Sequence, residues 1–368
     1  MRPEPGAGTD TGPGMDWYAD PAVRAWVTDA APSGAPAEYH RTLPGYAPTP
    51  LVEVSALAAA LGVGRLFVKD ESKRFDLGAF KVLGASWAVE QALAARPATD
   101  ELVTATDGNH GRGVARVARL RGLPATVFMP GTVPPIVIER VRAEGASVHV
   151  LAGDYDAAVA TARDHAAPRP GALLVQDTAW PGYEQVPAWI VEGYETLFAE
   201  LDAQLAAAGA RHPSLIAVPV GVGSLAQAAV AHYRAPDWRA AGRAAPALLS
   251  VEPDSAACVL ASLRAGAAAP VPTAGTIMNG LNCGTPSTIA WPLIAAGMDA
   301  AIAVTDAACR SAMAELGAHG IGSGPSGAAS YTGIVAALTG AGAEARRSEL
   351  GLAPDATVVA LSTEGPLV

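Results

Sequence analysis

Short apolar runs alternate with helical spacings of apolar residues between residues 102 and 177. The predicted strands of this stretch are 102–105, 125–129, 147–151 and 172–177. Apolar residues at helical spacing predict the intervening helices over 112–120, 134–146 and 154–167. Strands and helices that alternate at this pitch form right-handed βαβ units and a parallel sheet. We therefore assign 85–178 to a small α/β domain.

A second α/β pattern occupies the remainder of the chain. A long helix is predicted from Pro187 to about Ala208, and a further one from Asp306 to Leu316. The predicted strands of this pattern are 66–69, 214–220, 247–253, 300–304 and 356–362. We assign 37–84 and 179–368 to a large domain. Residues 1–36 are expected to be a disordered N-terminal extension, because Met1–Met15 is rich in Gly, Pro and Asp.

Composition narrows the class of protein. The 368 residues carry a net charge of −10, which argues against a general nucleic-acid or anionic-membrane binder. Three cysteines are too few for a disulfide scaffold, and neither they nor the seven histidines have metal-ligand spacing. No apolar stretch is long enough to span a membrane, and the N-terminus lacks the pattern of a signal peptide. We expect a cytoplasmic protein without a metal ion.

Lys81 is the first candidate for chemistry. It stands between Phe80 and Val82, where an apolar-periodic run predicts the start of an amphipathic helix. Apolar neighbours and a helix N-terminus both lower the pKa of a lysine from its usual value of about 10.4. A neutral amine is the nucleophile that forms a Schiff base with an aldehyde. The ordinary alternative is a lysine that extends to solvent at a helix start.

A glycine-containing turn is the second candidate. It lies between a predicted strand and a predicted helix and consists of Gly221, Val222, Gly223, Ser224 and Leu225. The converging backbone N–H groups and the positive end of the following helix form an anion cradle that suits a phosphate. The motif alone is weak, since similar turns occur in nicotinamide-nucleotide-binding folds and in turns that bind nothing.

Two further features carry polar side chains at the ends of predicted strands. Asp107, Asn109 and His110 surround Gly108 in a strand-to-helix turn, although a generic turn also uses Asp, Gly and Asn. Ser362 follows the last predicted strand, at the carboxyl edge where α/β sheets bind ligands. Neither feature is specific by itself.

Together these features are the parts that hold pyridoxal 5′-phosphate, and here the chain resembles a known family. It is similar to the fold type II pyridoxal-phosphate enzymes, which include tryptophan synthase β and threonine dehydratase, and among them it most resembles diaminopropionate ammonia-lyase. The aspartate of DGNHG, where dehydratases usually carry serine, and the final STEG are the lyase-like signals. In chain order, the matching stretches are HRTLPGYAPTPL, KDESKRFDLGAFKVLG, TATDGNHGRGVA, QDTAWPGYEQVPAWIVEGY, PVGVGSLA, VEPD, TIMNGLNCGTPSTIAW, SGPSGA and STEG.

The resemblance implies an α/β fold with two open, twisted, parallel-rich sheets flanked by helices and an active site between the two domains. It implies a homodimer that acts on a small amino acid and has no nucleic-acid or membrane partner. The implied reaction is α,β-elimination, which converts 2,3-diaminopropionate to pyruvate and ammonia.

The resemblance also implies roles for particular residues. Lys81 would form the Schiff base with the cofactor and move protons, and Asp107 would be the second acid or base. Asn109 would bond the pyridoxal 3′-oxygen, and Ser362 would face the pyridine nitrogen. The cofactor phosphate would be held by Gly221, Val222, Gly223, Ser224 and Leu225. The substrate carboxylate would be received by the turn of Thr106, Asp107, Gly108, Asn109 and His110.

Two cysteines acquire an expectation from the same resemblance. Cys258 and Cys283 each lie next to a motif that the family places at the ligand edge of the sheet, so we expect them close together near the active-site entrance. A reducing cytoplasm favours free thiols, and a disulfide is the alternative.

The chain departs from the family pattern at three places. Gly78 stands where the family usually has Asn, Pro325 stands where it usually has Glu, and the sequence stops at Val368 soon after STEG. These departures bear on the substrate and on the level of activity. The alternatives are a serine or threonine dehydratase, a β-replacement enzyme, a catalytically impaired pyridoxal-phosphate-binding homologue, and a nicotinamide-nucleotide-binding module built on the turn 221–225.

Overall fold

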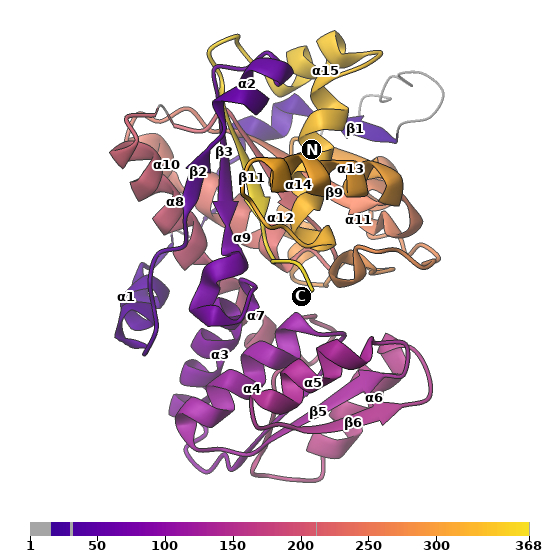
Figure 1. The fold of residues 1–368 in the computed structure, drawn as a ribbon. Helices are drawn as coiled ribbons and strands as arrows, with labels where there is room; N and C mark the ends of the chain where they lie inside the picture. The colour runs from indigo at the N-terminus through magenta and orange to yellow at the C-terminus, as the bar shows by residue number, and fades with distance from the viewer. Residues whose placement is uncertain (1–15, 30–31, 211, 368) are drawn as a thin grey trace. The chain divides into compact units, whose positions relative to one another are not determined.

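The computed structural model describes residues 16–29, 32–210 and 212–367 and divides into two compact units (Figure 1). Within the described residues, unit 1 comprises the chain up to Ser33, Pro48–Ser72 and Leu197–Pro366. Unit 2 comprises Gly34–Ala47, Lys73–Thr196 and Leu367. Both units are α/β, as the alternating pattern of the sequence predicts. The prediction of disorder for Met1–Met15 lies outside the described residues.

Unit 1 is built on a 7-stranded sheet with the order β1-β10-β9-β8-β11-β3-β2. The five inner strands run parallel, and the two edge strands, β1 and β2, pair antiparallel to their neighbours. The strands are β1 Trp17–Ala19, β2 Leu51–Glu53, β3 Arg65–Asp70, β8 Leu215–Pro219, β9 Ala247–Pro253, β10 Ala300–Val304 and β11 Thr357–Ser362.

Helices cover this sheet, and alternate residues of its strands form one apolar core with them. Leu249 and Val251 of β9 share that core with Ile334 of α14. A Cβ on Gly333 of α14 would lie 2.3 Å from Val251 Cγ2, so this helix approaches the sheet closely. The helices of unit 1 are η1 Pro21–Ala25, α2 Ser55–Leu61, α9 Ser224–Tyr233, α10 Pro236–Ala240, η3 Asp254–Ala256, α11 Cys258–Ala265, η4 Asn279–Leu281, α12 Ala290–Gly297, α13 Asp306–Ala318, α14 Pro325–Leu338 and α15 Ala343–Leu350.

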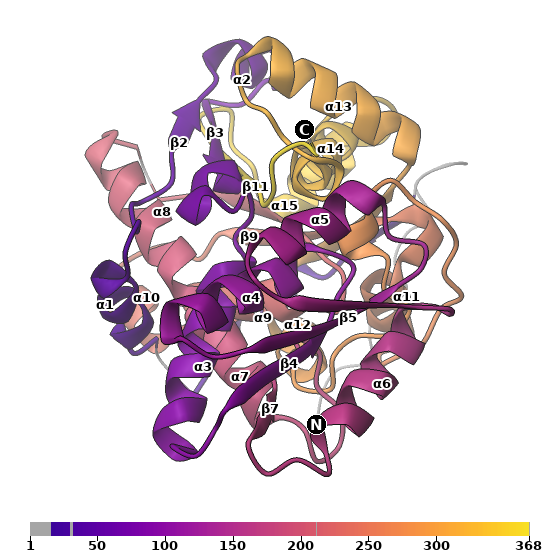
Figure 2. The same ribbon diagram turned by 60° about the horizontal axis from the view of Figure 1, so that its bottom comes forward.

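Unit 2 is built on a 4-stranded parallel sheet with the order β6-β5-β4-β7. Its strands are β4 Glu101–Ala105, β5 Ala125–Pro130, β6 Ser147–Leu151 and β7 Ala172–Leu174, and its helices are α1 Ala35–Thr42, α3 Lys81–Ala95, α4 Asn109–Arg121, α5 Pro135–Ala143, α6 Tyr155–Ala166 and α7 Gln185–Gly193. Successive side chains of a strand point to opposite faces of a sheet. Phe128 packs with α6, whereas its neighbour Val127 faces Gly111 of α4, so these helices cover opposite faces (Figure 2).

The predicted N-terminal extension is partly ordered, so the prediction of disorder for 1–36 is wrong for the segment 17–25. Trp17 of β1 pairs with Ile302 of β10, is 7 % exposed, and donates from Nε1 to Glu349 Oε2 at 2.8 Å. The sequence pattern missed this short strand because an edge strand of three residues has too few positions to show alternation.

The units differ from the predicted domains at their boundaries. Residues 73–84 and 179–196, which we assigned to the large domain, lie in unit 2. The reason is the close packing of α3 on α7, because a Cβ on Gly193 would lie 2.6 Å from Leu83 O and one on Gly84 would lie 2.6 Å from Tyr194 Cε1. His40 of α1, another segment assigned to the large domain, is buried in the same unit, within 2.7 Å of Thr196 Oγ1 and 3.0 Å of Leu83 O.

Two predicted elements have different lengths in the structure. The long helix predicted from Pro187 to Ala208 is divided into α7 and α8 Glu195–Ala207, with Tyr194 as the C-cap of α7. The strand predicted over 172–177 is assigned only to Leu174, although Val175 N still donates to Val103 O of β4 at 2.8 Å. Gln176 N donates instead to Tyr183 Oη at 2.8 Å, so the pairing with β4 ends after Val175.

Candidate active site

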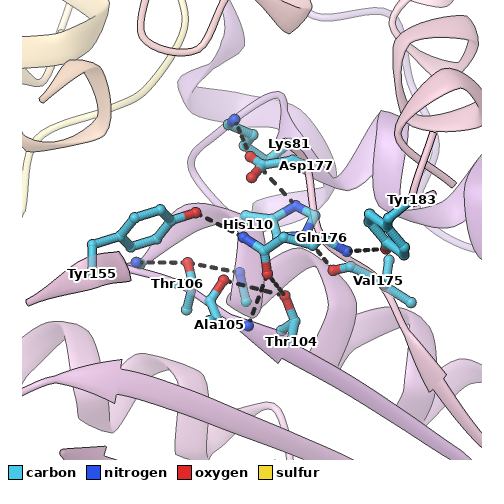
Figure 3. Close-up of polar contacts among 12 residues, drawn as sticks. Lys81, Thr104, Ala105, Thr106, His110, Tyr155, Val175, Gln176, Asp177 and Tyr183 are labelled. Atoms are coloured by element: carbon cyan, nitrogen blue, oxygen red, sulfur yellow. Dashed lines mark hydrogen bonds and ion pairs between the residues drawn. The ribbon is translucent and has the colours of Figure 1, made fainter. Parts of the chain in front are cut away.

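Lys81 is the first residue of α3, as the apolar pattern predicts, and its amine meets a carboxylate there (Figure 3). Lys81 Nζ lies 2.6 Å from Asp177 Oδ2, and the two side chains are 20 % and 9 % exposed. Burial alone would raise the pKa of Asp177, but the Lys81 ammonium and His110 lower it below its usual range. The pair therefore favours a charged Lys81 amine, whereas the sequence suggested a neutral one.

Lys81 is one of only three lysines in the sequence, with Lys69 and Lys73. Lys69 is fully buried and lies 2.7 Å from Glu200, and its Nζ also donates to Thr49 O at 2.9 Å. Lys73 is exposed. Lys81 alone combines partial burial, a helix start and a carboxylate partner, so it is the amine best placed for covalent chemistry.

His110 lies on the other side of the same carboxylate. Its Nε2 is 2.8 Å from Val175 O, and since a carbonyl only accepts, Nε2 carries the proton. Nδ1 therefore presents a lone pair and lies 3.8 Å from Asp177 Oδ2. Burial lowers the pKa of His110, which favours the neutral ring. Within the described part of the chain, Nδ1 has no hydrogen-bond partner.

The turn that follows β4 is held by Thr106 and by Gln176. Thr106 Oγ1 accepts from Gly108 N at 2.9 Å and from Gly111 N at 3.1 Å, and so satisfies N–H groups at the start of α4. Gln176 Oε1 accepts from Ala105 N at 3.0 Å (Figure 3). The turn is thereby fixed to the segment that carries Asp177.

The predicted polar residues of this turn sit at the N-terminus of α4. Asn109 is the first residue of the helix and Gly108 is its N-cap with φ 157°. Asp107 and Asn109 are partly exposed, whereas Thr106 and His110 are buried. We had expected the helix to begin at residue 112. The earlier start places Asn109 and His110 in the first turn of α4, where backbone N–H groups have no partner inside the helix.

The predicted phosphate cradle belongs to unit 1. Residues 221–223 connect β8 to α9, and Gly223, with φ 98°, is the N-cap of that helix. A Cβ on Gly223 would lie 2.7 Å from Ile294 Cδ1, and one on Gly221 would lie 3.0 Å from Cys283 Sγ. Position 223 therefore requires glycine, and Gly221 leaves little room for a side chain. A glycine turn that leads into a ten-residue helix has the geometry for binding an anion.

Ser362, also in unit 1, ends β11 and is buried. Its Oγ donates to Ser323 Oγ at 2.7 Å. Ser323 belongs to the SGPSG stretch in which Pro325 departs from the family pattern, and Pro325 is the first residue of α14. Proline fits that position because its missing N–H would have no partner inside the helix.

Cys258 and Cys283 are free thiols, so the expected default is confirmed and the alternative of a disulfide is not. Both face the same residue of the cradle, because Cys258 Sγ lies 3.7 Å from Gly221 O and Cys283 Sγ would contact a Cβ on Gly221. Burial raises the pKa of the Cys258 thiol.

The structure thus brings one group of predicted residues together within each unit. Unit 2 holds Lys81, Thr106, Asp107, Gly108, Asn109 and His110, and unit 1 holds Gly221, Val222, Gly223, Ser224, Leu225 and Ser362. The sequence reasoning missed Asp177. The signal was available, because Asp177 follows β7, which pairs in parallel with β4, so it lies at the same edge of the sheet as Asp107.

These residues fit pyridoxal phosphate in chemistry. Lys81 supplies an amine, and the Gly221–Leu225 turn supplies backbone N–H groups at a helix N-terminus. His110 Nδ1 is a buried acceptor that has no hydrogen-bond partner among the described residues. Residues 16–29, 32–210 and 212–367 contain no group of three or more His, Cys, Asp or Glu that could hold a metal ion. No helix in these ranges is long and apolar enough to cross a membrane.

Comparisons with known proteins agree with this chemistry. The family described as pyridoxal-phosphate dependent enzyme matches residues 42–364. The diaminopropionate ammonia-lyase of Salmonella typhimurium is 39 % identical over 280 residues, which cover 70 % of this chain and 68 % of that protein. The diaminopropionate ammonia-lyase of Escherichia coli K12 is 33 % identical over 363 residues, or 89 % of this chain and 87 % of that protein.

Solved structures of similar proteins also superpose on this chain. The crystal structure of the Escherichia coli diaminopropionate ammonia-lyase in complex with D-serine superposes with a TM-score of 0.87 at 31 % identity, covering 96 % of this chain and 94 % of that one. Maize serine racemase superposes with a TM-score of 0.74 at 25 % identity, covering 91 % and 94 %. The predicted fold class, two parallel-rich sheets flanked by helices, is thereby confirmed.

Proposed function

Because the chain belongs to the pyridoxal-phosphate dependent enzymes and, within them, to the diaminopropionate ammonia-lyase family, we propose that it converts 2,3-diaminopropionate and water to pyruvate and two ammonia molecules. Pyridoxal phosphate, when bound, supplies an electron sink for the negative charge that develops at Cα. The observation that carries the proposal is the Lys81 amine, held 2.6 Å from Asp177 at the start of α3.

The proposal gives each of the predicted cofactor residues a role. Lys81 would bond the cofactor covalently, and Asn109 would bond its 3′-oxygen. The turn 221–225 holds its phosphate through backbone N–H groups and the N-terminus of α9. Ser362 would face its pyridine nitrogen. The phosphate assignment is supported by the conformation of the turn, because Gly223 has φ 98°, a Cβ there would lie 2.7 Å from Ile294 Cδ1, and the backbone leads directly into the N-terminus of α9.

Proton transfer falls to Lys81 and Asp107. We propose that one of them removes the Cα proton, depending on the configuration of the substrate, and that Asp107 protonates the departing amine. The residues 106–110 receive the substrate carboxylate at the N-terminus of α4, where N–H groups and the helix dipole favour an anion.

The second amino group of the substrate explains why this site is rich in carboxylates. Diaminopropionate carries an additional ammonium group, which serine and threonine lack, and an ammonium group requires an anionic partner when it leaves water. Asp107 and Asp177 provide two such groups in unit 2. A dehydratase that expels hydroxide from serine has no need of them.

A coupled pyruvate assay tests the proposal. Purified protein with pyridoxal phosphate is supplied with D- and L-diaminopropionate, and with D- and L-serine and L-threonine for comparison. We expect the largest kcat/KM for diaminopropionate. Faster pyruvate formation from serine, or 2-oxobutanoate from threonine, would favour a dehydratase, and no keto acid from any of them would reject a lyase.

We further propose that the enzyme is a cytoplasmic homodimer. The support is its family membership and three free cysteines, which suit a reducing compartment. Light scattering coupled to gel filtration should give twice the chain mass of 37.1 kDa. A mass of one chain would contradict the dimer.

A further inference from the structure

The backbone just before Lys81 adopts a conformation that residues with a Cβ rarely adopt. Phe75 has φ 49° and Asp76 has φ 57°, and Gly78 follows with φ 76°. The left-handed region is strained for Phe and Asp, because the Cβ approaches the following carbonyl oxygen. Such strain persists only where the surrounding structure holds it in place, and it is concentrated at functional sites. The question is what holds this segment.

Two arginines of α4 bind its carbonyl oxygens. Arg116 Nη1 donates to Phe75 O at 3.0 Å, and Arg112 Nη1 donates to Leu77 O at 2.7 Å. The arginines are four residues apart, so they project from the same face of the helix. Guanidinium groups make strong, charge-assisted hydrogen bonds. The two bonded carbonyls flank Asp76, at the centre of the strained segment.

One buried carboxylate holds both arginines. Glu144, the C-cap of α5, is 4 % exposed. Its oxygens accept from Arg116 Nε at 2.6 Å and Nη2 at 3.0 Å, which is a bidentate pair, and Arg112 Nε lies 3.5 Å away. Burial alone would raise the pKa of Glu144, but the arginines lower it below its usual range, so it is ionised at neutral pH.

We propose that Arg112, Arg116 and Glu144 form a clamp that fixes the segment 75–78 and thereby sets the position of the Lys81 amine. They are positioning residues, since the two arginines bond the backbone before Lys81 and not the amine itself, and Glu144 acts through the arginines. The inference rests on the proposed function in taking Lys81 as the residue that bonds the cofactor. All parts of the clamp lie in unit 2, together with Lys81 and Asp177.

Arg119 provides a matched control on the same helix. It also pairs with Glu144, at 3.1 Å, and its side chain is 51 % exposed. Among the described residues it makes no hydrogen bond to the segment 75–78. Arg116→Gln and Arg119→Gln each remove one ion pair with Glu144, but only Arg116→Gln also removes the bond to Phe75 O.

The test compares wild type, Arg116→Gln and Arg119→Gln as holoenzymes. Hydrogen exchange measured by mass spectrometry follows the peptide spanning 73–83, and absorbance titration gives the Kd of pyridoxal phosphate. Arg116→Gln removes a charge-assisted hydrogen bond that stabilises the folded conformation of this segment. We therefore expect faster hydrogen exchange in the 73–83 peptide and a cofactor Kd that is roughly tenfold higher or more. Arg119→Gln should change either value less than about threefold.

A conservative variant separates positioning from simple stabilisation. Arg116→Lys keeps a positive charge opposite Glu144 but lacks the planar fork that joins this carboxylate to Phe75 O. We expect it to recover most of the melting temperature lost in Arg116→Gln while the 73–83 peptide still exchanges fast. If Arg116→Gln does not fold, Arg112→Gln, which removes the bond to Leu77 O, takes its place in the same measurements.

Two results would overturn the clamp: wild-type exchange and cofactor affinity in the Arg116→Gln protein, or equal changes in Arg119→Gln. The proposed function fails separately, if the wild-type holoenzyme forms no pyruvate from diaminopropionate. Hydrogen exchange and the cofactor Kd require no turnover, so they judge the clamp in either case.

Discussion

Asp177→Asn tests the ion pair at the centre of the candidate site. The substitution keeps the size of the side chain and one oxygen acceptor but removes the charge opposite Lys81. In the wild type, Lys81 Nζ and Asp177 Oδ2 are 2.6 Å apart, and Asp177 is 9 % exposed. The low pKa of Asp177 means that the charge is present at neutral pH. The variant therefore leaves a partly buried ammonium group without its anion.

The expected loss follows from the geometry of the pair. A hydrogen bond to a charged group contributes about 1.5–3 kcal/mol when buried. Solvent reaches Lys81, whose side chain is 20 % exposed, and screens part of this interaction. We expect a loss of about 1–2 kcal/mol in the free energy of unfolding, and a decrease of roughly 5- to 30-fold in kcat/KM for diaminopropionate if the pair also positions the amine.

The stability that Asp177 contributes should depend on pH in a known direction. The folded-state pKa of Asp177 is below its unfolded value, so its contribution to stability is present above the unfolded pKa of about 3.9 and is lost as the pH falls through the folded value. The difference in the free energy of unfolding between wild type and Asp177→Asn should have its full size at pH 7 and be smaller at about pH 3. Urea unfolding at both values measures it.

Asp164→Asn is the control for the charge change itself. Asp164 pairs with Arg163 at 3.1 Å on the surface, and its side chain is 71 % exposed. Loss of this ion pair should lower the free energy of unfolding by less than about 0.5 kcal/mol. Wild-type stability and kcat/KM in Asp177→Asn at pH 7 would refute the reasoning, as would a stability difference that does not shrink at acid pH.

Three other substitutions address the cofactor and proton transfer. Lys81→Ala should abolish the cofactor's covalent link and almost all turnover, and borohydride labelling of the wild type should map to Lys81; labelling of Lys69 or Lys73 would contradict this. Asp107→Asn should lower the rate for one enantiomer of diaminopropionate by about two to four orders of magnitude and for the other by less. Equal, modest losses for both enantiomers with a lower melting temperature would assign Asp107 a structural role. Gly223→Ala should weaken cofactor binding because its Cβ would meet Ile294. The control Gly209→Ala, at φ 61° with no atom within 4 Å of the added Cβ, should lower stability without changing cofactor binding. Equal cofactor Kd values for the two variants would count against the phosphate cradle.

The sequence by itself determined the elements and the local chemistry. The alternation of apolar runs and helical spacings is a local property, and it predicted the parallel sheets of both units. Lys81 was found because its neighbours Phe80 and Val82 mark a helix start. The glycines at 221 and 223 were found because a turn that leads into a helix N-terminus needs residues without a Cβ.

The tertiary structure alone decided which distant groups meet. Asp177 lies 96 residues after Lys81, and no periodicity relates two positions on different elements. The assignment of α3 to unit 2 depends on Gly84 and Gly193, whose lack of side chains lets two helices approach. The bond between Arg116 and Phe75 O likewise joins a helix to a strained loop 41 residues earlier. Such contacts arise from the packing of elements, and local sequence patterns report only the backbone conformation and the face that each element buries.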